Sequence, residues 1–250
     1  MKKEIHTVPV AEAFASNDEC PFCHLRRQAE QRAIRYFAGP GASYMEPTVR
    51  GITNETGFCT DHMKKLYDYG NALGNALMIQ THYETILLQL RDQMEHYEIP
   101  AKKGLFQRKK PAEEVPYWQR LQQQADRCAI CDRVEDTMQR HYQVFFSLLK
   151  EAEFRQLVED SKGFCLDHFA QLLQEAEPHL PPKYAQWFYS TVYKTMEENL
   201  QRVKDDLDWL IEKYDYRNAD APWKNSKDAL QRAMQKLSGI YPADPPYRKE

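Results

Sequence analysis

Apolar residues recur at steps of three and four along most of this chain, which is the spacing of amphipathic helices. Residues 25–34 follow this rhythm and consist of good helix formers, and residues 134–149 repeat it. Two longer stripes cover residues 66–97 and 193–214. Their alternating steps predict long coiled-coil-like helices, whose stripes either pack against other helices of the chain or form a seam for a partner. We therefore predict an all-α fold.

The chain contains an internal repeat of two cysteine motifs. A Cys-x-x-Cys pair at Cys20 and Cys23 recurs at residues 128–131, and the run Gly-Phe-Cys-x-Asp-His at residues 57–62 recurs at residues 163–168. The order is the same both times, and the gap between the motifs is 36 positions in the first copy and 34 in the second. Such regular self-similarity indicates a duplicated unit. Each copy is expected to be a metal-binding helical unit with one long helix.

Four segments follow from the repeat. We expect a first unit over 10–98, an exposed linker rich in basic residues and proline over 99–116, a second unit over 117–217, and a C-terminal helix and tail over 218–250. In the last segment a helix is predicted over 223–236, with Ser226 as its N-cap. The basic run 102–110 is typical of a solvated linker, and a contact with a phosphate-bearing partner is the alternative interpretation.

Charge and the length of the apolar runs argue against a nucleic-acid-binding protein and against a membrane-spanning protein. With 34 Lys and Arg against 37 Asp and Glu, the net charge of −3 offers no field that would attract nucleic acid. No apolar run approaches the ~20 residues needed to span a bilayer. The apolar stretch near the N-terminus is short and interrupted by Glu12, so we expect no export signal and a cytoplasmic location. In a reducing compartment, clustered thiols bind metal or carry redox chemistry more often than they form disulfides.

The cysteines define the candidate chemistry. All six lie in the repeated motifs, and two of the eight histidines stand three residues after the third cysteine of each copy. Three thiolates and one imidazole form the ligand set of a closed tetrahedral zinc site. We predict two zinc ions per chain, one within each repeat, with these ligands: Cys20, Cys23, Cys59 and His62 in the first repeat, and Cys128, Cys131, Cys165 and His168 in the second.

The residues around the second motif suggest how it is built. Gly57 and Gly163 are expected to adopt a backbone conformation that only glycine reaches at low cost. The cysteines should lie at helix starts, where free amides stabilise thiolates. Asp61 and Asp167 occupy matching positions. They are either acidic residues of a first helical turn or acceptors that orient the neighbouring histidine.

Other chemistries compete with zinc for these residues. An iron–sulfur cluster suits thiolates, and exposed thiolates can serve a redox sensor. The sequence from Cys20 to His24 matches the attachment motif of c-type haem, but Asp132 stands at the corresponding place in the repeat. A thioredoxin-like pair needs a βαβ frame that the sequence does not predict. Buried cysteines that merely pack would not recur at fixed spacing with a matching histidine.

The duplicated motifs, together with Asp215-Tyr216-Arg217-Asn218 and the run from Pro222 to Leu230, resemble an uncharacterised bacterial family known only as a domain of unknown function. The resemblance extends over almost the whole chain. It implies a bacterial, cytoplasmic protein and brings no activity with it.

The sequence favours a non-enzymatic function. It contains no Gly-rich phosphate loop, no His-Glu-x-x-His and no Gly-x-Ser-x-Gly. We expect a zinc-stabilised helical scaffold that binds another protein, or a second copy of itself, through its long helices or the tail around Trp223. The alternatives are an iron–sulfur or thiolate-based redox protein that uses the same eight residues and, less in keeping with the charge, a nucleic-acid binder.

Overall fold

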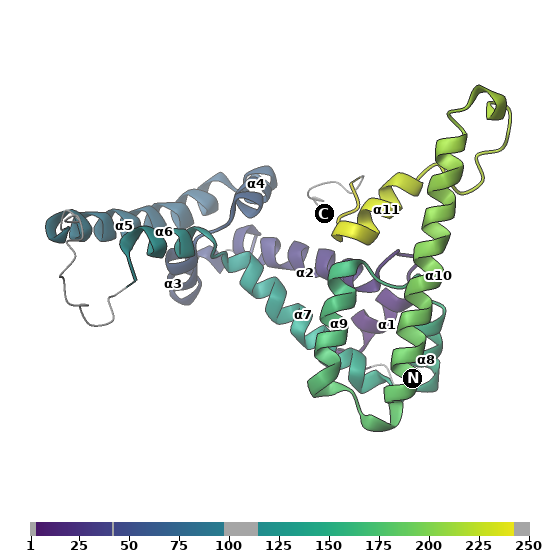
Figure 1. The fold of residues 1–250 in the computed structure, drawn as a ribbon. Helices are drawn as coiled ribbons and strands as arrows, with labels where there is room; N and C mark the ends of the chain where they lie inside the picture. The colour runs from purple at the N-terminus through teal and green to yellow at the C-terminus, as the bar shows by residue number, and fades with distance from the viewer. Residues whose placement is uncertain (1–3, 42, 98–114, 243–250) are drawn as a thin grey trace, which may run out of the picture. The chain divides into compact units, whose positions relative to one another are not determined.

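The computed structural model describes residues 4–41, 43–97 and 115–242, and within these ranges the regular structure is entirely helical (Figure 1). The predicted all-α fold is thus confirmed. The eleven α-helices of the described residues are α1 (Val8–Ala15), α2 (Pro21–Ala38), α3 (Pro47–Thr56), α4 (Thr60–Tyr69), α5 (Ala72–His96), α6 (Tyr117–Ala125), α7 (Ala129–Leu148), α8 (Ala152–Glu159), α9 (Leu166–His179), α10 (Ala185–Glu212) and α11 (Ala229–Ser238). Short 3₁₀ turns occur at Ser43–Met45, Pro182–Tyr184 and Tyr216–Asn218.

The chain forms two compact units that cut across the sequence repeats. Unit 1 combines Met1–Ala29 with Glu135–Pro245, and unit 2 contains Glu30–Val134. The segments 10–98 and 117–217 describe the repeats, whereas each compact unit takes residues from both of them. The predicted linker 99–116 lies, apart from its last two residues, outside the described residues. Among the described helices, none is long and apolar enough to cross a membrane.

Unit 1 is built around aromatic side chains that belong to the cysteine motifs or pack on them. Phe22 lies between the two cysteines of the first motif, and Phe164 directly precedes Cys165. Both rings are fully buried, and their centroids are 5.9 Å apart. Phe14 of α1 and Phe145 of α7 contact each other in the same cluster at 5.4 Å. The core therefore brings the first motif of one repeat beside the second motif of the other.

Each unit has one long helix, as predicted. In unit 1, α10 spans 28 residues and packs against α8 and α11 (Figure 1). In unit 2, α5 spans 25 residues and packs against α3 and α4. Only Gly74 and Met78 of α5 are buried. Its outer half leaves apolar side chains exposed, among them Tyr83, Leu87, Leu88, Leu90 and Met94.

Two predicted boundaries are wrong in detail. The stripe 66–97 is not one helix, because Gly70 ends α4 in the left-handed conformation at φ 86° and Asn71 starts a new helix. The Asn71 side chain accepts a hydrogen bond from the Gly74 amide at 3.0 Å. The tail helix begins at Ala229 and not at residue 223. Ser226 is buried and donates its hydroxyl to the Trp223 carbonyl at 2.7 Å, so it closes a turn before the helix and does not cap it.

Candidate metal centres

All eight predicted ligands gather into two clusters, and in each cluster the ligand atoms lie within 4.8 Å of one another. Site 1, in unit 1, comprises Cys20, Cys23, Cys165 and His168; site 2, in unit 2, comprises Cys59, His62, Cys128 and Cys131. The prediction that each repeat closes its own site is wrong. Each site joins the Cys-x-x-Cys pair of one repeat to the Gly-Phe-Cys-x-Asp-His run of the other.

The lengths of the helices are in keeping with this exchange. After the first Cys-x-x-Cys pair, the 18 residues of α2 extend over about 27 Å, whereas the 10 residues of α3, which precede the second motif, extend over about 15 Å. The second motif therefore returns beside the latter half of α2, where Nε2 of His62 lies 3.0 Å from Oε1 of Glu30. In the other repeat, α7 has 20 residues and α8 has 8. There Tyr142 of α7 donates to Gln171 of α9 at 2.7 Å. In both repeats the return path ends short of the starting cysteines.

The geometry within each cluster suits one tetrahedral ion. In site 1, Nδ1 of His168 lies 3.5 Å from Sγ of Cys20, 3.3 Å from that of Cys23 and 3.2 Å from that of Cys165. The Cys23 and Cys165 sulfurs are 3.6 Å apart, and all six cysteines are free. The edges of a tetrahedron with metal–sulfur bonds of about 2.3 Å measure about 3.8 Å. Four donor atoms at such separations fit around one ion.

Site 2 has the same geometry. Nδ1 of His62 lies 3.2 Å from the sulfurs of Cys59 and Cys128 and 3.3 Å from that of Cys131. The Cys59 and Cys131 sulfurs are 3.8 Å apart. Both histidines therefore present Nδ1 to the thiols, and their Nε2 atoms point away from the cluster.

The packing of thiols strongly perturbs their ionisation. In site 2, burial is the largest single influence on Cys128 and opposes its ionisation. The hydrogen bonds with His62 and with the backbone of Cys131 and Cys59, together with the charge of His62, outweigh burial and lower the pKa of this thiol to about 6. Burial and the neighbouring Cys128 raise the pKa of Cys131. The His62 ring is partly desolvated, which lowers its pKa, yet its contacts with Cys128 and Glu30 raise that pKa to about 10. The cluster therefore favours ionisation of Cys128 beside a protonated His62 and opposes ionisation of Cys131.

Site 1 follows the same pattern. Hydrogen bonds from Cys20 and Cys23 lower the pKa of Cys165, and the contact with Cys165 raises the pKa of Cys23. Burial lowers the pKa of His168, but the neighbouring cysteines raise it to about 10. A divalent ion would satisfy three thiolates at once and replace these shared protons.

Local backbone geometry prepares the ligands. Gly57 and Gly163 have φ values of 60° and 75°, as the sequence predicted for positions that require glycine. Cys59 and Cys165 then stand at the N-cap positions of α4 and α9. The His168 amide donates to the Cys165 sulfur at 3.5 Å. Amides at a helix start stabilise a thiolate, which is the form that binds metal.

The two sites differ outside the ligand set. At site 2, Oε1 of Glu30 accepts from the His62 ring and also from Lys65 Nζ at 2.6 Å. At site 1, Nε2 of His168 is buried and has no hydrogen-bond partner among the described residues. Glu30 lies seven positions after Cys23, and the matching position after Cys131 is the buried Met138. Glu30 was not among the predicted site residues, and the one signal for it in the sequence is that an acidic residue in the first repeat stands where the second repeat has methionine.

Asp61 and Asp167 lie in the first turns of α4 and α9, which is one of the two roles expected for them. Asp61 is exposed. The acceptor that the structure gives to His62 is Glu30, and Asp167 lies 3.5 Å from the Gln171 side-chain amide. An orienting role for either aspartate stays a prediction.

Solvent access also separates the sites. All four ligands of site 1 are buried, whereas Cys59 and Cys131 of site 2 are half-buried. Site 1 therefore lies in the interior of unit 1, and two cysteine residues of site 2 are partly accessible to solvent.

Comparison with known proteins places the chain in a family without an assigned activity. Residues 1–244 match the family described as "Family of unknown function (DUF6062)", so the chain belongs to it. It is also similar to the "Uncharacterized 23.9 kDa protein in xynA 3'region" of Caldicellulosiruptor sp. (strain Rt8B.4), with 21% identity over 204 residues, which cover 80% of this chain and 85% of the relative. No solved structure matches the chain.

Proposed function

We propose that this member of the family is a non-enzymatic helical scaffold stabilised by two structural zinc ions. The observation that carries the proposal is the pair of separate clusters, each with three cysteine sulfurs and one histidine Nδ1. Zinc accepts this donor set in tetrahedral geometry, and four protein ligands leave no position for water or substrate. Both ions would be bound as fixed parts of the fold.

The exchanged pairing strengthens the structural argument. Cys23 and Cys165 are 142 positions apart in sequence, and Cys59 and Cys131 are 72 apart. Each ion would therefore close a longer loop than the one within a repeat. The entropy of closing a loop rises with its length, so an ion that bridges the repeats opposes unfolding more effectively. A zinc ion in each unit would also fix both repeats in one fold.

The scaffold needs a surface for its partner, and α5 exposes a series of large apolar side chains along its length. Tyr83, Leu88 and Met94 are each more than 60% exposed. Trp223, by contrast, lies with its ring centroid 5.0 Å from Lys213 Nζ and is partly covered. We therefore assign the partner contact to α5 in preference to the tail, with another protein or a second copy of the chain as the ligand in a reducing cytoplasm.

Metal analysis of protein purified without air tests the proposal. We expect two equivalents of zinc per chain and a colourless protein. Cys59→Ser should remove one equivalent and Cys165→Ser the other. A brown protein with absorbance near 400 nm would instead support the iron–sulfur alternative. A metal-free protein with an unchanged melting curve would contradict a structural role for either site.

A further inference from the structure

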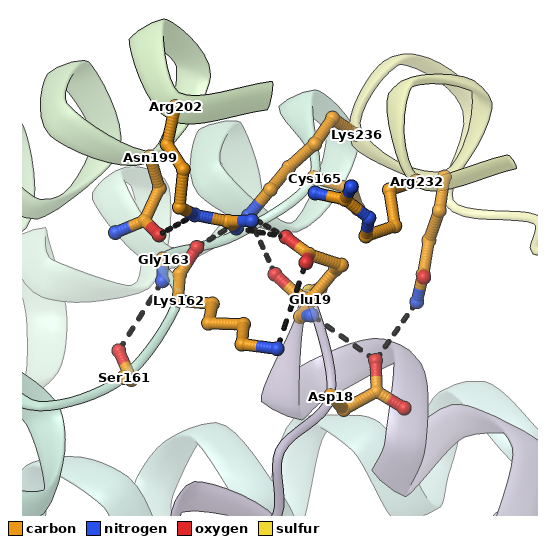
Figure 2. Close-up of polar contacts among 12 residues, drawn as sticks. Asp18, Glu19, Ser161, Lys162, Gly163, Cys165, Asn199, Arg202, Arg232 and Lys236 are labelled. Carbon is orange, nitrogen blue, oxygen red and sulfur yellow. Dashed lines mark hydrogen bonds and ion pairs between the residues drawn. The ribbon is translucent and has the colours of Figure 1, made fainter. Parts of the chain in front are cut away.

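Lys236 of α11 is a buried lysine beside site 1. Its side chain is 1% exposed, which is rare for a lysine unless the charge is paired. The ammonium group donates to the Glu19 carbonyl at 2.6 Å and to the Lys162 carbonyl, and it lies 3.4 Å from the Glu19 carboxylate (Figure 2). These contacts give the charge a fixed position in the interior of unit 1.

The two carbonyls belong to the segments that carry the ligands of site 1. Glu19 directly precedes Cys20, and Lys162 directly precedes the Gly163-Phe164-Cys165 run. One ammonium thus connects the start of the first motif with the start of the second, although they come from different repeats. Arg202 of α10 adds to this connection, since it donates to the Glu19 carboxylate at 2.5 Å (Figure 2).

The end of α11 covers the sulfurs themselves. Gly239 caps the helix at φ 75°, and a Cβ atom placed on it would lie 3.5 Å from the Cys165 sulfur and 3.7 Å from the Cys23 sulfur. Gln235 holds the same helix to Asp18 through a hydrogen bond of 2.8 Å. The helix also packs against α9 and α10. A chelator or a competing metal therefore cannot reach these sulfurs from the α11 side while the helix is docked.

Site 2 has a different arrangement. Its lysine contact is Lys65, which is 22% exposed and binds the Glu30 side chain. That contact does not connect the two segments that carry the ligands. Two of the site 2 sulfurs, those of Cys59 and Cys131, also belong to half-buried residues.

We propose that Lys236 is a positioning residue that locks site 1, so that metal leaves this site only after α11 undocks, whereas metal at site 2 exchanges directly with solution. The proposal rests on the proposed function, because it requires both clusters to bind metal. It assigns the C-terminal helix the role of a latch on one site. The two chemically equal ligand sets then become a slow and a fast metal site.

The wild-type protein provides the first test. Loaded with ¹¹³Cd, the wild-type protein should give two ¹¹³Cd resonances. The resonance that is missing in Cys59→Ser is the one from site 2. On addition of a strong chelator, the site 2 resonance should disappear at least tenfold faster than that of site 1. Equal rates, or faster loss from site 1, would overturn the proposal. Absence of bound metal in both sites would instead refute the proposed function.

The second test removes the ammonium group. Lys236→Met should keep the ¹¹³Cd chemical shift of site 1, because the ligands are unchanged. It should accelerate the loss of metal from site 1 at least tenfold, which corresponds to about 1.4 kcal/mol in the free energy of undocking α11. Loss from site 2 should stay at the wild-type rate. If site 1 lost metal no faster in this variant, the latch would be wrong.

Lys213→Met is the matched control. Lys213 is likewise buried in unit 1, and its ammonium donates to the carbonyls of Asn218, Ala219 and Ala221 at 2.7 to 2.8 Å. It binds neither segment that carries a ligand. The control should therefore leave both exchange rates unchanged, and an equal acceleration in both variants would show that general loosening, and not the latch, controls the exchange. The comparison in wild type decides the proposal even if Lys236→Met does not fold.

Discussion

Replacing two cysteines of one site should remove one zinc ion, whereas replacing two cysteines of one repeat should remove both. Cys20→Ser/Cys165→Ser affects site 1 alone, because both sulfurs belong to that cluster. Cys20→Ser/Cys59→Ser affects one ligand in each cluster. The two double variants contain the same number of substitutions, and the first of them shares Cys20→Ser with the second, so each serves as the control for the other.

The structure also sets the scale of the stability change. Binding of a structural zinc ion is worth of order 10 kcal/mol, and most of it stabilises the fold. The loop between Cys23 and Cys165 is about twice as long as that between Cys59 and Cys131, namely 142 against 72 positions. Each doubling of a loop adds about 0.6 kcal/mol to its closure entropy. Loss of site 1 should therefore destabilise the protein somewhat more than loss of site 2.

Zinc content by mass spectrometry and thermal unfolding by circular dichroism are the assays. We expect one equivalent of zinc in Cys20→Ser/Cys165→Ser and none in Cys20→Ser/Cys59→Ser, with the lower melting temperature in the second. The reverse stoichiometry would mean that each repeat closes its own site. That result would refute the helix-length argument for the exchange between repeats.

Three further outcomes are expected. A strong chelator under reducing conditions should abolish most of the cooperative melting and only part of the helical circular-dichroism signal, because α5 and α10 have apolar stripes of their own that favour helix. An unchanged melting curve after verified metal removal would contradict a structural role for the sites. Glu30→Gln should weaken metal binding at site 2 by about 10- to 100-fold and leave site 1 unchanged in competition titrations, because the carboxylate orients the His62 ring. Gly57→Ala should lower the free energy of unfolding by about 1 to 3 kcal/mol, because φ at this position is 60° and the new Cβ would lie 2.7 Å from the His82 ring. Gly51→Ala is the control, since there is open space around Gly51, and thermal unfolding should show no destabilisation in this variant.

The sequence was sufficient for the all-α class, for several of the longer helices and for the identity of the candidate ligands. Apolar steps of three and four depend only on local geometry, so they predicted α10 and the core-facing residues of α7. Ligand identity followed because every cysteine belongs to a repeated motif. The break at Gly70 was not predicted, since the apolar rhythm continues through it and only the left-handed glycine and the Asn71 cap reveal the turn.

The pairing of the motifs could not be read from their spacing. Both Cys-x-x-Cys pairs and both Gly-Phe-Cys-x-Asp-His runs are chemically equivalent, so either combination satisfies the same donor set. The choice depends on where the helices between the two motifs place the second motif, which is a long-range property of the fold. Lys236 escaped notice for a related reason, because a lysine in a short amphipathic helix is usually a surface residue. Only the docked position of α11 places its ammonium between two backbone segments.

Duplication gives the two repeats the same ligands, and the differences between them lie in what surrounds those ligands. The first repeat supplies Glu30 to the histidine of site 2, and the matching position in the second repeat is Met138, so His168 is left without an acceptor among the described residues. Site 1 has instead the tail helix, with Lys236 on the ligand segments and Gly239 against the sulfurs. A hydrogen-bonded histidine at a half-buried site and an unpartnered histidine at a sealed site favour different rates of metal release. The two sets of ligands are chemically equal, but they differ in their access to solvent and in the side chains that contact them. Substitutions outside the ligands should therefore alter the metal binding of one site at a time.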